Sequence, residues 1–80
     1  MRIDKYLKVS RLIKRRTIAN EACNAGRILI NGKTAKASQN VKVGDIIEIT
    51  LGNKNTKAEI LSVAEIYNKE EAKEMFKYIT

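Results

Sequence analysis

The stretch TIANEACNAGRILINGK, residues 17–33, contains start and end signals for two consecutive elements. Thr17 can cap a helix, because its hydroxyl can accept a hydrogen bond from an exposed amide of the first turn. Small apolar residues then recur at helical spacing, and Gly26 predicts the end of the helix because glycine tolerates the left-handed conformation. The residues RILI predict a short strand. The Asn31-Gly32 pair predicts a hairpin, since a type I′ turn needs a positive φ at both positions.

Outward from this stretch, apolar spacing and turn residues predict the remaining elements. They are a helix over 3–9, a return strand over 33–36, a turn over 41–45, a strand over 46–51, a polar loop over 52–56, a strand over 57–66, and a final helix over 69–78 capped by Asn68. This order predicts an α+β fold, with two N-terminal helices packed on a small, mostly antiparallel sheet, plus a C-terminal helix. We expect residues 1–80 to form a single domain.

Positive charge is concentrated in the first half of the chain. The net charge is +7, and residues 1–40 alone carry ten basic residues against two acids. Seven of those basic residues lie within residues 1–16, interleaved with apolar positions. A folded basic surface of this kind is typical of nucleic-acid binding. Sparse aromatic residues near it favour structured RNA, read through phosphates, sugars and shape, over a single-strand binder.

Three side chains near the basic positions have alternative interpretations. Tyr6 can stack on a base, although its spacing from Ile3 and Leu7 favours a place in the core. Asp4 can cap the first helix or hold Lys8, four residues on. Asn31 is explained by turn chemistry alone, although loops often contact ligands.

Enzymatic, metal and membrane functions receive little support from the composition. The chain has no histidine, and its acids in the second half, at 45, 48, 59, 65, 70, 71 and 74, look like surface positions. We therefore expect neither an enzyme nor a metal or cofactor site. Cys23 cannot form an internal disulfide and fits a small buried position. There is no signal peptide and no apolar span of ~18 residues, so we expect a soluble cytoplasmic protein.

Several motifs together resemble one family, the S-four RNA-binding domain. They are RIDKYL at 2–7, SR at 10–11, the run from 16 to 22, GRILINGK at 26–33 and VGD at 43–45. The resemblance implies two packed helices followed by a small antiparallel sheet, with the RNA surface on the helices and the adjoining hairpin. It covers about residues 1–50, leaving residues 51–80 as a strand and helix extension.

The length and the run KRRTIANEA resemble the stand-alone bacterial subgroup called RqcP, which is similar in role to small heat-shock proteins that bind ribosomes. The resemblance implies a role in ribosome-associated quality control. The partners would be rRNA and peptidyl-tRNA on obstructed large ribosomal subunits, and an RqcH-type factor that adds an alanine tail. We expect a monomer. Carried onto this chain, the RNA-binding positions are Arg2, Lys5, Arg11, Lys14, Arg15, Arg16, Arg27 and Lys33, with Asp4 as organiser of the surface.

Two other functions remain open from the sequence. An RNA chaperone or ribosome-assembly factor would use the same basic surface on another structured RNA. A basic protein of the membrane surface would need a broad apolar helix face with large anchors. The first helix is short and has neither tryptophan nor phenylalanine, so we do not expect a membrane partner.

Overall fold

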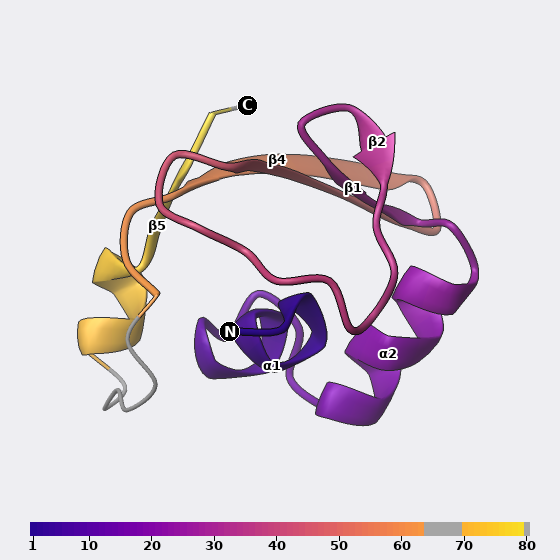
Figure 1. Cartoon of the computed structure of the whole chain (residues 1–80), viewed down its shortest axis with the longest axis horizontal. Helices are drawn as coiled ribbons and strands as arrows, with labels where there is room; N and C mark the ends of the chain where they lie inside the picture. Colours follow the sequence, from indigo (N-terminus) through magenta and orange to yellow (C-terminus); the bar gives the residue numbers. More distant parts are fainter. Residues whose placement is uncertain (64–69, 80) are drawn as a thin grey trace.

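In the computed structural model, which describes residues 1–63 and 70–79, two helices lie on one side of an antiparallel sheet (Figure 1). The helices are α1 (Ile3–Val9) and α2 (Arg16–Asn24). The strands are β1 (Ile28–Ile30), β2 (Lys33–Thr34), β3 (Ile46–Leu51), β4 (Lys54–Ile60) and β5 (Phe76–Tyr78), in the sheet order β2-β1-β3-β4-β5. The predicted α+β class, with two N-terminal helices on a small antiparallel sheet, is confirmed.

The two helices bury their apolar faces against each other and against the sheet. The buried side chains on them are Ile3, Tyr6, Leu7, Ala19, Ala22 and Cys23. Those of α2 are small, which allows the two helices to approach closely. The predicted core position of Tyr6 and the predicted burial of Cys23 are confirmed. Burial, together with the charge of Asp4, raises the pKa of the Cys23 thiol, which disfavours the reactive thiolate form.

The start of α2 and the hairpin that follows it differ in how well the sequence predicts them. Helix α2 begins at Arg16, and Arg15 occupies the N-cap without a side-chain hydrogen bond. The prediction that Thr17 caps the helix is therefore wrong, because Thr17 already lies in the first turn. Asn31 and Gly32 have φ values of 52° and 83°. The predicted hairpin is confirmed, although its return strand ends at Thr34.

Strands β3 and β4 form the longest pairing in the sheet. The register runs from Ile46 opposite Glu59 to Leu51 opposite Lys54, which leaves only two residues for the connecting turn. The predicted polar loop over 52–56 is therefore too long, and the following strand begins earlier than predicted. That strand ends at Ile60, residues 61–63 are not in a strand, and positions 64–66 of the prediction lie outside the described residues.

The predicted helix over 69–78 is wrong in its described part. The chain instead forms a short 3-10 helix, η1 (Glu71–Glu74), followed by β5, which pairs with the free edge of β4. Asn68, its predicted cap, and position 69 lie outside the described residues. Apolar residues at helical spacing favoured a helix, but a strand here also satisfies backbone groups along the open edge of β4, and aromatic residues such as Phe76 and Tyr78 fit strands well.

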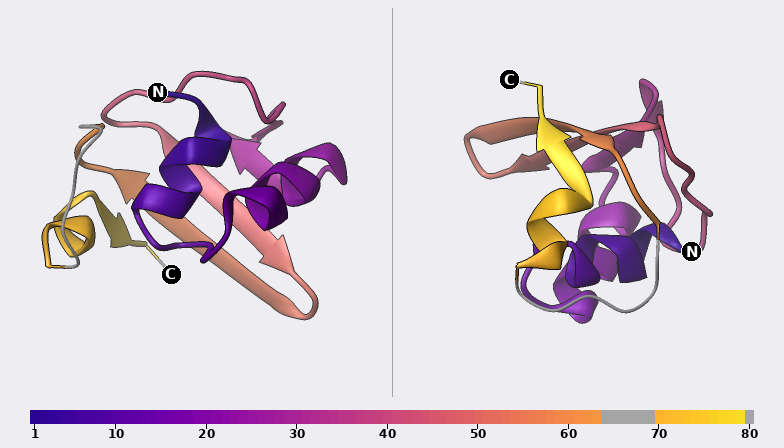
Figure 2. Two further views of the ribbon diagram at one scale, coloured as in Figure 1. Left: turned by 90° about the horizontal axis from the view of Figure 1, so that it is seen from below. Right: turned by 90° about the vertical axis from the view of Figure 1, so that its left-hand side faces the viewer.

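Met75 joins this C-terminal segment to the helices. Its side chain is fully buried in the cluster that contains Ile3, Tyr6 and Leu7. Its carbonyl oxygen accepts a hydrogen bond from the Tyr6 hydroxyl at 2.8 Å and others from the amides of Leu61 and Ser62. Figure 2 shows η1 and β5 lying beside α1 at one end of the molecule. In the described part of the chain, no helix has the length and apolar character needed to cross a bilayer.

Candidate RNA-binding surface

Asp4 is the centre of a polar cluster at the start of α1. The carboxylate is nearly inaccessible, with 2% of the residue exposed. It accepts hydrogen bonds from Arg2 at 3.1 Å, from Arg16 at 3.4 Å, from the Asn20 side chain at 3.4 Å and from the Lys5 amide at 2.8 Å. We call Arg2, Asp4, Arg16 and Asn20 the Asp4 cluster. These contacts, rather than either predicted alternative, hold the carboxylate: Asp4 lies inside α1 and is not its N-cap, which is Arg2, and the bonds to its carboxylate come from residues other than Lys8.

The geometry of this cluster leaves positive charge at the surface. One buried carboxylate faces two guanidinium groups, and each arginine side chain remains 47% exposed. A guanidinium has five N–H donors, and each arginine gives Asp4 a bond from one nitrogen only, so further donors remain for a ligand. Two orientated guanidinium groups beside each other suit a phosphate, which they can bind through paired hydrogen bonds.

The ionisation of Asp4 links this cluster to stability. Burial alone would raise the pKa of Asp4, but the hydrogen bonds from Asn20 and the Lys5 amide and the charges of Arg16 and Arg2 outweigh it and lower that pKa below 3.8. A carboxyl whose pKa is lower in the folded state stabilises the fold above its unfolded pKa. This stabilisation is lost as the pH falls through the folded pKa.

Replacing Asp4 by asparagine should therefore lower the free energy of unfolding by about 1–3 kcal/mol at neutral pH, because hydrogen bonds to a charged acceptor are lost. The difference from the wild type should shrink at acidic pH, below the ordinary pKa of an aspartate, because the stabilisation by the wild-type carboxylate is lost as the pH falls towards the lowered pKa of folded Asp4. Urea denaturation at both pH values measures it. A difference of equal size at the two pH values would show that the charge of Asp4 does not stabilise the fold.

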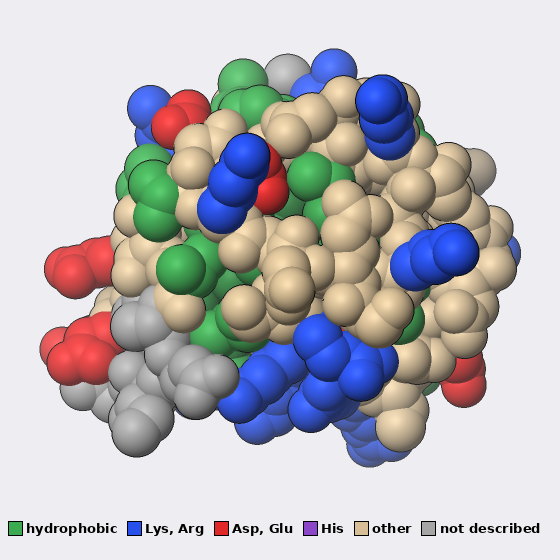
Figure 3. Space-filling view, viewed as in Figure 1, with side chains coloured by type: hydrophobic (Ala, Val, Ile, Leu, Met, Phe, Trp, Pro, Cys, Tyr) green, Lys and Arg blue, Asp and Glu red, His purple; other side chains and the backbone are tan. Residues whose placement is uncertain are grey.

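The predicted RNA-binding residues are almost all accessible. Those whose side chains are exposed are Arg2, Arg11, Lys14, Arg15, Arg16, Arg27 and Lys33, while Lys5 is half-buried. Figure 3 shows lysine and arginine side chains gathered along the lower edge of the molecule, where Figure 1 draws α1 and α2. Acidic side chains lie away from this edge, mostly at the two sides of the view.

The structure brings only part of the predicted set together. Arg2 and Arg16 meet at Asp4, and Arg15 directly precedes Arg16. Arg27 lies beyond the opposite end of α2, next to β1. Residues 11–14 are not helical, so the common face that helical spacing would give Arg11, Lys14 and Arg15 does not form.

Arg11 has an unusual backbone conformation at the corner after α1. Its φ is 64°, a left-handed conformation that costs a residue other than glycine about 1–2 kcal/mol. Replacing Arg11 by glycine should raise the free energy of unfolding by about 1 kcal/mol, because the strain is relieved. The same change should weaken RNA binding, because a cation is lost. Thermal denaturation and an RNA-binding titration measure the two effects; a less stable variant would contradict the account of strain.

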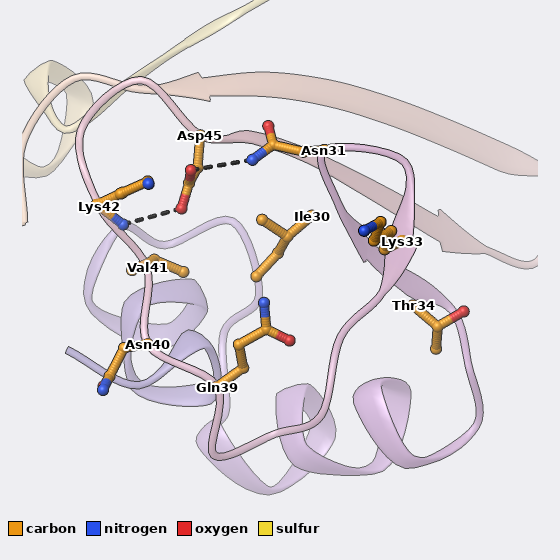
Figure 4. Close-up of a pocket in the computed structure, with 9 residues that line it drawn as sticks. All are labelled: Ile30, Asn31, Lys33, Thr34, Gln39, Asn40, Val41, Lys42 and Asp45. Carbon is orange, nitrogen blue, oxygen red and sulfur yellow. Dashed lines mark hydrogen bonds between the residues drawn. The ribbon is translucent and has the colours of Figure 1, made fainter.

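A second polar site lies between the hairpin and the segment that precedes β3 (Figure 4). Its hollow has a volume of about 530 Å³. The lining residues are Ile30, Asn31, Lys33, Thr34, Gln39, Asn40, Val41, Lys42 and Asp45. Lys33 and Lys42 lie on opposite sides of it in Figure 4. Lys42 was not among the predicted residues, although its place directly before Val43-Gly44-Asp45, within the predicted turn, was the available signal.

Asp45 organises this second site. It is 5% exposed, so the prediction of an ordinary surface acid is wrong. Its carboxylate accepts hydrogen bonds from the Asn31 side chain at 3.1 Å and from the Lys42 amide at 3.0 Å. The side-chain oxygen of Asn31, Oδ1, in turn accepts one from the Ile46 amide at 2.9 Å. Asn31 therefore fixes the hairpin to β3, and its side chain is engaged within the protein.

Comparison with known proteins agrees with this architecture. Residues 1–47 match the family model of the S4 domain. A protein of Halalkalibacterium halodurans named RQC P-site tRNA stabilizing factor is 54% identical over 95% of this chain and 86% of its own length. One of Streptococcus pneumoniae with the same name is 49% identical over 100% of this chain and 91% of its own length.

A solved structure shows the same fold. Heat shock protein 15 of Vibrio cholerae, described as trimeric, superimposes with a TM-score of 0.89 at 26% identity, over 98% of this chain and 80% of that one. The family match covers α1, α2, β1 and β2, which carry the Asp4 cluster and the hairpin. The chain belongs to the S4 domain family, in the branch whose members are named RQC P-site tRNA stabilizing factor.

Proposed function

We propose that this protein binds rRNA and tRNA on obstructed large ribosomal subunits and stabilises the tRNA in the P site during ribosome-associated quality control. The observation that carries the proposal is the Asp4 cluster, where a buried carboxylate orientates two exposed guanidinium groups. Relatives that share about half of its residues are named RQC P-site tRNA stabilizing factor, which supports the proposal.

In this proposal the contact residues are Arg2, Lys5, Arg11, Lys14, Arg15, Arg16, Arg27 and Lys33, with Asp4 as organiser. The Asp4 cluster binds phosphates directly, while Arg27 and Lys33 extend the surface towards the hairpin. The chain acts as one RNA-binding domain of residues 1–80, a proposal that the packing of Met75 against α1 supports. Its contribution is binding and positioning rather than catalysis, in the cytoplasm, where it supports alanine tailing by an RqcH-type factor.

In this proposal the free protein is a monomer. The relative from Vibrio cholerae is described as trimeric. Light scattering of the free protein decides between these states.

The role is tested by recovering the tagged, native protein from cells and identifying the particles that accompany it. Large subunits carrying peptidyl-tRNA are the expected product. Recovery with assembly precursors or with small RNAs would contradict the proposed role and favour an assembly factor or RNA chaperone.

A further inference from the structure

A hollow on the molecule lies between the corner after α1 and the C-terminal segment, beyond the Asp4 cluster. Its volume is about 420 Å³, which is within the range of small-ligand sites. The residues that line it are Ser10, Arg11, Ala72, Lys73, Phe76, Lys77 and Tyr78. Among these described lining residues every charged side chain is basic. Two other lining residues, Ser10 and Ala72, are small and buried, so they line the inner side of the hollow.

The sheet register explains why aromatic rings are found here. Phe76 and Tyr78 lie opposite Ile60 and Ala58 of β4, and residues directly opposite each other project to the same side of a sheet. Ile60 and Ala58 are buried, so the two rings are on the side that the helices cover. Helix α1 ends at Val9, and the ring nearest the chain end remains open to solvent.

Tyr78 is 64% exposed, yet its ring has a fixed neighbour. Its centroid lies 5.1 Å from that of Phe76, with the rings edge to face at 82°. Tyr78 also lines a smaller hollow of about 100 Å³ together with Leu12, Ile49 and Leu51. A single exposed tyrosine needs no explanation. This ring instead stands between two hollows, held by a second aromatic ring and next to basic side chains.

We propose that this hollow binds an unpaired nucleotide of RNA, with its base stacked on Tyr78 and its phosphate near Arg11 and Lys73. The proposal rests on the proposed function for the identity of the RNA. Unpaired bases are commonly bound by stacking on aromatic side chains, with basic groups following the backbone. Lys77 contributes less, because its ammonium pairs with Glu59 at 3.8 Å.

Two observations favour RNA over a protein partner as the occupant. The charges among the described lining residues are all positive, and Arg11 places one of them at a backbone position with φ 64° that glycine would occupy without strain. Arg11 also belongs to the basic N-terminal segment, residues 1–16, that contains Arg2 and Arg16. A purely apolar protein contact would require neither feature.

The test compares two oligomers of equal length and charge, a single-stranded oligouridylate and an abasic ribose-phosphate chain. The wild-type protein should bind the oligouridylate about tenfold more tightly, the size expected for one stacked base. Tyr78→Ala should abolish this preference, Tyr78→Phe should retain it, and Tyr78→Leu should behave like Tyr78→Ala. Lys73→Gln should weaken binding of both oligomers equally, because it removes only a phosphate contact.

Circular dichroism of each variant checks that the fold is intact. If Tyr78→Ala loses the pairing of β5 with β4, Tyr78→Leu replaces it as the variant without a stacking ring. Equal binding of the two oligomers by the wild type, or an unchanged preference in Tyr78→Leu, would overturn the proposal. The proposal would also be overturned if Tyr78→Leu lost a contact with a protein of purified large subunits while its binding of both oligomers stayed unchanged. Failure of the proposed function is distinguishable, since the preference for bases would then persist while the wild type failed to bind subunits carrying tRNA.

Discussion

Replacing Arg2 and Arg16 together by glutamine should weaken binding to large ribosomal subunits about 100-fold. Each guanidinium that contacts a phosphate contributes a charge-assisted hydrogen bond, and its loss corresponds to roughly tenfold in affinity. The slope of log affinity against log salt should also become shallower by about 2, because two phosphate contacts are lost. Co-sedimentation with purified subunits at several salt concentrations gives both quantities.

Glutamine is the appropriate replacement because of the buried carboxylate. A glutamate at Arg16 would place a second acid beside Asp4, at the position of a guanidinium that now lies 3.4 Å from it, and would disturb the fold as well as binding. The matched control replaces Lys36 and Lys57, two basic residues outside the predicted contact set, by glutamine. It removes two positive charges, as the test variant does. A loss of equal size in the control would show that total charge, rather than the Asp4 cluster, determines binding.

Replacing Met75 by alanine should lower the free energy of unfolding by about 2–5 kcal/mol, the range for truncating a large buried side chain. Met75 is fully buried against α1 although it is far from it in sequence. The loss should therefore affect the helices as well as the C-terminal segment, and unfolding should remain a single transition. Urea denaturation followed by circular dichroism and by tyrosine fluorescence measures this.

Val43 provides the control for this substitution, because it is 60% exposed. Val43→Ala should change the free energy of unfolding by less than about 0.5 kcal/mol. A Met75→Ala protein as stable as the wild type, or two separate transitions in the wild type, would contradict a single core that includes the C-terminal segment.

The elements with local signals were predictable from the sequence. The hairpin at Asn31 and Gly32 follows from the φ requirements of its turn, and the end of α2 follows from Gly26, whose φ is 73°. These are properties of a few neighbouring residues. The local signal for the start of α2 was misleading, because Thr17 is a favourable capping residue, whereas the N-cap is Arg15, which makes no side-chain hydrogen bond.

The parts that depend on distant pairing could not be predicted in the same way. The spacing of Ala72, Met75 and Phe76 fits a helix, and only the open edge of β4 makes a strand more favourable. The burial of Asp45 depends on Asn31, which lies fourteen residues away in sequence. For the candidate site, the basic residues could be predicted from the sequence. That Arg2 and Arg16 both contact Asp4 could not, because it depends on how α1 and α2 pack together.

One binding measurement tests most directly whether the Asp4 cluster binds tRNA on the large subunit. Large subunits carrying peptidyl-tRNA in the P site are compared with the same subunits after the tRNA has been released, using the wild type and the Arg2→Gln/Arg16→Gln protein. We expect the wild type to bind tRNA-bearing subunits more tightly and the variant to lose most of that affinity. Equal wild-type affinity for both kinds of subunit, or full affinity of the variant, would contradict the account.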